Sequence, residues 1–146
     1  MKTQVAIIGG GPSGLLLGQL LHGAGIEAVV LERRSKDYVL KRIRAGVLER
    51  GLVSLLEKAG CADRLHAQGF VHDGAFITSG DDAFRIDFKA LTGTSVIVYG
   101  QTEVTRDLYE ARDRTGGATE FEVDDVVIND AKTDAPFVTY TVAGEP

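Results

Sequence analysis

The sequence predicts an α/β fold of the Rossmann-like βαβ type, and three segments near the N-terminus indicate it. Residues 4–8 form a short apolar, β-branched run followed directly by three glycines, which is typical of a buried strand. Residues 13–23 carry leucines on most sides and predict a buried helix, and residues 27–31 (EAVVL) predict a second buried strand. A strand, a helix and a strand within roughly thirty residues make a βαβ unit, so we expect the two strands to be parallel.

Composition limits the class of protein. The chain has 146 residues, 44% of them hydrophobic, and a formal net charge of −5, which gives no reason to expect nucleic acid or a membrane as a partner. Cys61 is the only cysteine, so no internal disulfide can form. Residues 15–31 are interrupted by Gln19, His22 and Glu27, which argues against a membrane span, and the N-terminus lacks a signal-peptide pattern. We therefore expect a cytoplasmic protein.

The pattern changes after the βαβ unit. Residues 46–59 predict a second helix, and residues 70–78 and 83–88 alternate around the turn signal Ser79-Gly80-Asp81-Asp82, which predicts an antiparallel hairpin. The remaining predicted elements are a strand over 96–99, a helix over 102–114, and strands over 119–128 and 136–142. We expect residues 1–73 and 96–146 to belong to the βαβ domain and residues 74–95 to begin an inserted antiparallel β domain. The chain ends directly after its last predicted strand, so we expect an incomplete domain.

The motif Gly9-x-Gly11-x-x-Gly14 fits the dinucleotide-binding fingerprint. Gly9 would make the turn out of the strand, Gly11 would let a pyrophosphate approach the backbone, and Gly14 would let helix and strand pack closely. Glu32 ends the second strand, where a carboxylate would bind the ribose hydroxyls. The fingerprint itself does not distinguish FAD from NAD(P), and the alternative to both is a glycine-rich turn that binds no ligand.

Position 10 differs from the other glycines of the motif because the fingerprint does not require a glycine there. We expect Gly10→Ala to be tolerated. We expect Gly11→Ala to impair binding, because its β-carbon would meet the pyrophosphate.

Three long segments carry a resemblance to a known family: MKTQVAIIGGGPSGLLLGQLLHGAGI, ERRSKDYVLKRIRAGVLERG and VYGQTEVTRDL. With few gaps from Met1 to about Tyr140, the sequence resembles the para-hydroxybenzoate hydroxylases, a family of single-component, FAD-dependent aromatic hydroxylases. Members of that family are much longer, so the resemblance implies that this chain is the N-terminal part of such an enzyme. It implies a Rossmann-like FAD-binding fold with the start of an inserted substrate domain, and a homodimer for the full-length enzyme.

The resemblance also assigns roles to individual residues. The residues implied to bind FAD are Gly9, Gly11, Pro12, Ser13, Gly14, Glu32, Arg33, Arg42, Arg44, Val47 and Gln101. Those implied to bind NADPH on the surface of the FAD domain are Arg33, Tyr38, Arg42 and Arg44. His72, in FVHDG, matches the outer end of a proton relay from the substrate phenol.

Without the resemblance, each of these residues also has an interpretation in which it binds no ligand. Arg42 and Arg44 could face one anion or belong to a solvated basic loop, and Gln101 could serve only as a polar residue beside a helix start. His72 could be an ordinary surface histidine. Arg33, Arg34 and Tyr38 favour NADPH over NADH, because a 2′-phosphate binds cations.

Two functions of different classes therefore compete. The first is a monooxygenase that hydroxylates 4-hydroxybenzoate to 3,4-dihydroxybenzoate with FAD, NADPH and O2, of which this chain is a part that is inactive by itself. The second is a free-standing FAD- or ADP-binding module without catalysis. An NAD(P)-dependent dehydrogenase is disfavoured, because RIRAGVL and YGQTEV have no role there. We predict no metal site.

Overall fold

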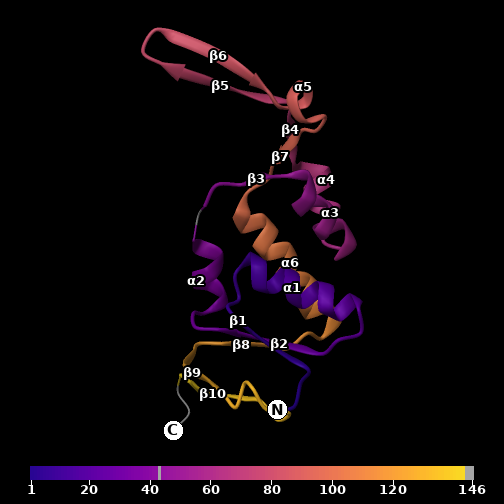
Figure 1. Cartoon of the computed structure of the whole chain (residues 1–146), viewed down its shortest axis with the longest axis vertical. Helices are drawn as coiled ribbons and strands as arrows, with labels where there is room; N and C mark the ends of the chain where they lie inside the picture. The colour runs from indigo at the N-terminus through magenta and orange to yellow at the C-terminus, as the bar shows by residue number, and fades with distance from the viewer. Residues whose placement is uncertain (43, 144–146) are drawn as a thin grey trace.

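A three-stranded parallel sheet lies at the base of the structure, a computed structural model that describes residues 1–42 and 44–143. Strand β1 (Val5–Ile8) pairs with β2 (Ala28–Glu32), and β8 (Thr119–Phe121) pairs with the other edge of β2. Helix α1 (Pro12–Gly23) connects β1 to β2, which confirms the predicted βαβ unit and its parallel strands. The sheet order is thus β1-β2-β8, with the carboxyl end of β1 opening directly into the glycine turn (Figure 1).

The central strand β2 has both faces covered. Val30 faces α1 and the long helix α6 (Gln101–Thr115) and belongs to the main core. Val29 and Leu31 face the other way and pack with Val123 in a second, smaller core. That second core is closed by the antiparallel strands β9 (Val123–Asn129) and β10 (Phe137–Val142), which lie below the sheet in Figure 1. Because alternate residues of β2 face opposite sides, the sheet packs against helices on one face and against β9 and β10 on the other.

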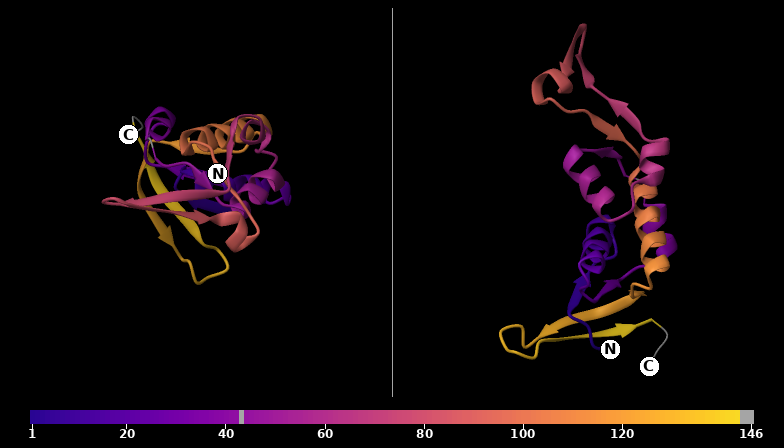
Figure 2. Two further views of the ribbon diagram at one scale, coloured as in Figure 1. Left: turned by 90° about the horizontal axis from the view of Figure 1, so that it is seen from above. Right: turned by 90° about the vertical axis from the view of Figure 1, so that its right-hand side faces the viewer.

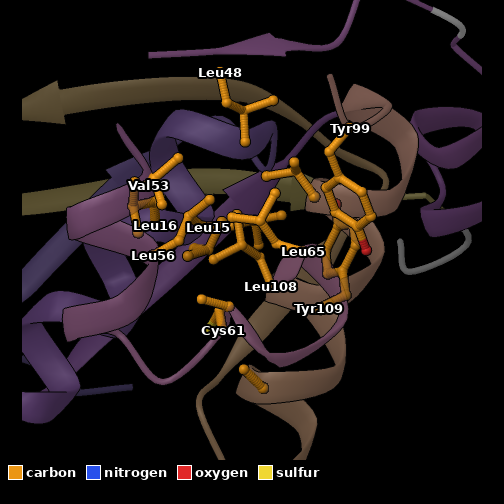
Figure 3. Close-up of a cluster of buried hydrophobic side chains, with 14 of the residues drawn as sticks. Leu15, Leu16, Leu48, Val53, Leu56, Cys61, Leu65, Tyr99, Leu108 and Tyr109 are labelled. Atoms are coloured by element: carbon orange, nitrogen blue, oxygen red, sulfur yellow. The ribbon is translucent and has the colours of Figure 1, made fainter. Parts of the chain in front are cut away.

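The main core gathers side chains from four helices. Leu15 and Leu16 of α1 meet Leu108 of α6, Leu56 of α3 (Arg50–Lys58) and Leu65 of α4 (Asp63–Gln68), as Figure 3 shows. Four of these five leucines have at most 1% of their surface exposed and Leu16 has 8%, so each contributes about 1.5–3 kcal/mol through burial. This core holds α1 and α6 together, and their N-termini frame the candidate site.

A second, antiparallel sheet extends the molecule away from the first. Strand β7 (Val96–Val98) pairs with β3 (Val47–Leu48) on one side and with β4 (Phe70–His72) on the other. Beyond β4 the hairpin of β5 (Gly74–Ser79) and β6 (Asp82–Asp87) projects outward, as both views of Figure 2 and Figure 1 show. The hairpin predicted from the turn signal is confirmed, and helix α5 (Phe88–Thr92) follows it.

Several predicted boundaries are wrong, each for a local reason. The helix predicted from residue 46 begins only at Arg50, because Val47 and Leu48 pair with β7. The strand predicted over 119–128 breaks at Glu122, whose φ is +58°, into β8 and β9. The strand predicted over 70–78 is interrupted at Asp73, between β4 and β5. The short helices α2 (Lys36–Lys41), α4 and α5 were not predicted.

Within residues 1–42 and 44–143, no helix is both long and apolar enough to cross a membrane.

Candidate nucleotide-binding site

The turn between β1 and α1 depends on two glycines of the fingerprint. Gly9 has φ +117°, a conformation that side chains disfavour. A β-carbon at Gly14 would overlap the carbonyl oxygen of Gly9, so helix and turn could not approach as they do. Gly11 is different: its backbone is extended, and no atom lies within 4 Å of the position its β-carbon would take. Gly9 and Gly14 are therefore required by the fold, whereas Gly11 leaves open space.

Gly10 is held more tightly than the sequence suggested. Its N–H donates to Glu32 Oε2 (2.7 Å), and its carbonyl accepts from the hydroxyl of Tyr109 (2.7 Å). A β-carbon there would lie 2.7 Å from the Cβ of Glu32 and 3.1 Å from the Tyr109 hydroxyl. The expectation that Gly10→Ala is tolerated is therefore wrong in this structure, because Glu32 and Tyr109 occupy the space a methyl group needs.

The N-terminus of α1 suits an anionic ligand. Gly11 is the N-cap and Pro12 follows it, no side chain among the described residues caps the helix, and its first turn carries no acid. Unpaired N–H groups and the helix dipole make such an end attractive to phosphate.

Glu32 stands at the carboxyl end of β2, as the fingerprint predicts. One carboxylate oxygen accepts from Gly10 N–H and the other from Arg34 N–H (2.8 Å). Each oxygen of a carboxylate accepts about two hydrogen bonds, so both retain capacity for a ribose hydroxyl. Glu32 therefore shapes the glycine turn as well as presenting an acceptor.

These parts surround one open hollow of about 600 Å³, which we call the nucleotide hollow. It lies where the glycine turn, the end of β2, helix α2, the segment after α2 and the start of α6 meet. Its lining residues are Gly11, Pro12, Glu32, Arg34, Tyr38, Val39, Arg42, Arg44, Gln101 and Thr105. The structure thus brings Arg42 and Arg44, the two cations of the non-helical segment, to the wall that also carries Gly11 and Glu32.

A second hollow of about 570 Å³ adjoins the first, and the two share Pro12 and Gln101. We call it the apolar hollow, because aliphatic side chains of α1, β3, α3 and α6 make up most of its wall. Its lining residues are Pro12, Ser13, Leu16, Ala45, Gly46, Val47, Leu48, Leu52, Gln101, Val104 and Leu108. Ser13 and Val47 therefore lie on a different wall from Arg42 and Arg44, although the four belong to one predicted site.

Four predicted residues line neither hollow: Gly9 and Gly14, which shape the glycine turn, and Arg33 and His72. Arg33 lines a separate depression with Gly9 and Asp124, whereas its neighbour Arg34 is in the nucleotide hollow, with its guanidinium 5.1 Å from the centre of the Tyr38 ring. His72 is the last residue of β4, exposed and paired with Val96 across the sheet. Among the described residues that line the two hollows, none belongs to β4.

A charged network fixes the start of α6, which the sequence did not reveal. Asp107 accepts from Arg64 (2.8 Å) and from the hydroxyl of Tyr99 (2.7 Å), and Arg64 also pairs with Glu103. Burial raises the pKa of Asp107, and burial together with the Asp107 hydrogen bond raises that of Tyr99. Burial alone would raise the pKa of Glu103, but hydrogen bonds from Arg64 and Arg106 bring it below its usual value. The network holds the turn that leads into Gln101.

Arg112 was also missed, and it ties the far end of the sheet to α6. Its side chain is 2% exposed, and it donates to the carbonyls of Ala118 (2.7 Å) and Ala28 (3.2 Å) and to the Thr119 hydroxyl. Burial lowers its pKa. Its guanidinium fills the space beside Gly18, which explains why α1 carries a glycine at that position.

Comparison with known proteins gives the site its context. Residues 2–146 match the FAD binding domain family. The chain is 54% identical over 145 residues to the p-hydroxybenzoate hydroxylase of Acinetobacter baylyi, an alignment that covers 99% of this chain and 36% of that enzyme. It is 34% identical over 87 residues to a probable NADH-specific resorcinol 4-hydroxylase of Rhodococcus jostii, covering 60% of this chain and 16% of that protein. The chain thus spans about a third or less of the length of these relatives.

Solved structures support the fold. The anhydrotetracycline hydroxylase of Streptomyces rimosus superposes with a TM-score of 0.80 at 23% identity, covering 98% of this chain and 29% of that one. The p-nitrophenol 4-monooxygenase of Pseudomonas putida superposes with a TM-score of 0.76 at 20% identity, covering 93% of this chain and 38% of that one. The Rossmann-like fold predicted from the sequence is confirmed.

Proposed function

The chain belongs to the FAD binding domain family, and from that membership we propose that the nucleotide hollow holds the ADP half of FAD. The observation that carries the proposal is the meeting of the glycine turn, Glu32, Arg42 and Arg44 around one hollow. These residues come from three separate segments of the chain, and each has the chemistry that one part of ADP requires.

The residues fit that group. Gly11 has no atom within 4 Å on its β-carbon side, so a pyrophosphate can approach its backbone. Within residues 1–42 and 44–143 no protein atom accepts a hydrogen bond from Gly11 N–H, which leaves that donor for a phosphate oxygen. Arg42 and Arg44 add positive charge on the same wall, and charge-assisted hydrogen bonds to phosphate are the strong ones. Glu32 supplies the acceptor for the ribose hydroxyls.

The adjoining apolar hollow is suited to the flavin ring. Aliphatic residues form most of its wall, and Val47 and Gln101 lie on it, as the family resemblance implies for the ring and the ribityl–phosphate region. Bound FAD would supply the redox chemistry of aromatic hydroxylation. The residues of this chain bind the cofactor, orient it along the two hollows and exclude water from its apolar portion.

We further propose that the protein containing this chain hydroxylates 4-hydroxybenzoate with NADPH and O2. The support is the 54% identity to a p-hydroxybenzoate hydroxylase over 99% of this chain. Tyr38, Arg42 and Arg44, which the family resemblance implies for NADPH, line the nucleotide hollow, and so does Arg34 rather than Arg33. His72 is exposed on β4, so its imidazole is open to solvent, as the outer end of a relay requires.

The alternative is an FAD- or ADP-binding module without catalysis, and a turnover assay separates the two. The purified chain is supplied with FAD, NADPH, O2 and 4-hydroxybenzoate, and 3,4-dihydroxybenzoate is measured by chromatography. We expect FAD to bind and no product to form, because the chain spans 36% of the hydroxylase it resembles. The same assay on a longer protein that contains this chain should yield product. Its absence there would favour the binding module.

A further inference from the structure

The peptide unit between Gly10 and Gly11 is held from the protein interior by Tyr109. The Tyr109 hydroxyl donates to the Gly10 carbonyl (2.7 Å), although the two residues are 99 positions apart in the sequence. Tyr109 is 1% exposed and extends from the middle of α6 toward the glycine turn. The contact is thus a tertiary one between α6 and the phosphate-facing loop.

The tyrosine ring cannot easily move away from this position. Phe121 of β8 packs against it with ring centres 5.6 Å apart, and the Lys36 ammonium lies 5.2 Å from the ring centre. Glycine at position 10 leaves the space that the hydroxyl occupies, since a β-carbon there would lie 3.1 Å from the hydroxyl oxygen. Packing therefore fixes the hydroxyl, and the hydroxyl in turn fixes the carbonyl of Gly10.

Because the peptide bond is planar, fixing the Gly10 carbonyl also fixes the direction of the Gly11 N–H. In a trans peptide the carbonyl of one residue and the N–H of the next point in opposite directions. Because the Gly10 carbonyl points inward to Tyr109, the Gly11 N–H points outward. Gly11 lines the nucleotide hollow, and its N–H donates to no protein atom among residues 1–42 and 44–143.

We propose that Tyr109 is a positioning residue for pyrophosphate, which holds the Gly10–Gly11 peptide so that Gly11 N–H faces the nucleotide hollow. This inference rests on the proposed binding of an ADP-containing cofactor. Glu32 holds the preceding peptide unit, since its carboxylate accepts the Gly10 N–H (2.7 Å). Tyr109 touches no ligand itself and acts only through the backbone of Gly10.

The competing explanation is that Tyr109 merely fills the core. A core-filling role predicts that removal of the hydroxyl changes stability and leaves ligand preference unchanged. A positioning role predicts a selective loss at the phosphates. ADP and adenosine share the base and ribose and differ in the phosphates, so the ratio of their affinities distinguishes the two roles.

The test is Tyr109→Phe, which removes the hydroxyl and keeps the ring. Dissociation constants for ADP and adenosine are measured by calorimetry, with Tyr140→Phe, a half-buried tyrosine of β10 outside both hollows, as the matched control. We expect Tyr109→Phe to weaken ADP binding by about three- to tenfold, the effect of one hydrogen bond. Adenosine binding should stay within about twofold of wild type, as should both ligands with Tyr140→Phe. An unchanged ratio of ADP to adenosine affinity in Tyr109→Phe would overturn the inference.

A second readout requires no ligand and separates this inference from the proposed function. In ¹H–¹⁵N spectra of the free chain, the Gly11 amide resonance should shift or broaden in Tyr109→Phe and remain unchanged in Tyr140→Phe. An unmoved Gly11 resonance in Tyr109→Phe would overturn the positioning role even if ADP binds. If the folded wild-type chain binds neither ligand, the proposed function is refuted. If the Gly11 resonance is nevertheless displaced in Tyr109→Phe, the effect of Tyr109 on the Gly10–Gly11 peptide still stands.

Discussion

One methyl group added at Gly11 should weaken cofactor binding and leave the stability of the fold almost unchanged. Gly11 has φ −76° and ψ 178°, a conformation that any residue adopts, and its missing β-carbon has no neighbour within 4 Å. The new methyl group in Gly11→Ala would therefore project into open space on the wall of the nucleotide hollow. The folded chain can accept it, but an approaching pyrophosphate cannot.

The expected change in stability is small because two contributions oppose each other. Alanine is a poorer N-cap than glycine, at a cost of up to about 1 kcal/mol. Replacing glycine also restricts the unfolded chain, which stabilises the fold by about 0.4–1 kcal/mol. The free energy of unfolding should thus change by less than about 0.5 kcal/mol. A charge-assisted hydrogen bond to phosphate contributes about 1.5–3 kcal/mol, so its loss should weaken FAD binding at least about tenfold.

The assay combines urea unfolding with fluorescence titration of FAD and ADP. Gly23→Ala is the matched control, because Gly23 lies at the other end of α1 and also has open space around its β-carbon position. It should bind FAD as the wild type does. Gly14→Ala should instead lose stability by about 1–3 kcal/mol or more, since its methyl group would overlap the Gly9 carbonyl. Equal FAD affinities of the wild type and Gly11→Ala would show that no pyrophosphate lies against Gly11.

Three further substitutions test other parts of the structure. Arg44→Gln should weaken FAD binding about tenfold and reduce its salt dependence, measured by titration at two ionic strengths, because it removes a cation from the hollow wall. Leu108→Ala should lower the free energy of unfolding by about 2–5 kcal/mol in urea, since the side chain is fully buried. Arg64 and Arg106 hold the pKa of Glu103 low, so the contribution of Glu103 to stability is present at neutral pH and is lost as the pH falls through the folded-state pKa. In thermal melts, the melting temperature of Glu103→Gln should therefore fall less steeply toward acid pH than that of the wild type. Three results would contradict these expectations: wild-type salt dependence in Arg44→Gln, an unchanged urea midpoint in Leu108→Ala, or a wild-type pH dependence of the melting temperature in Glu103→Gln.

The elements that depend only on neighbouring residues were predicted from local sequence patterns. The strand, glycine turn and helix of β1 and α1 follow from a β-branched run and from Gly9 and Gly14, whose conformation and close packing the structure confirms. The β5–β6 hairpin follows from the turn signal between its strands. Each of these elements is specified within a short stretch of chain, so periodicity and turn residues suffice.

Distant pairings could not be predicted in this way. Val47 and Leu48 fit the apolar face of a predicted helix but form a strand, because they pair with β7. That partner lies some fifty positions further along the chain, so no local pattern indicates the pairing. Tyr109 gave no signal on α6, since its contact with Gly10 exists only once the two core helices pack. The same holds for the choice between Arg33 and Arg34, which depends on the direction each takes after β2.

Binding of the ADP half of FAD in the nucleotide hollow is tested by a fluorescence titration of the purified wild-type chain with FAD, followed by competition with ADP. We expect saturable quenching of flavin fluorescence that ADP reverses, because Gly11, Glu32, Arg42 and Arg44 line one hollow. We also expect adenosine to compete more weakly than ADP, since the phosphates contact the glycine turn. A folded chain that leaves FAD fluorescence unchanged, or that releases FAD equally to adenosine and ADP, would contradict the proposed binding.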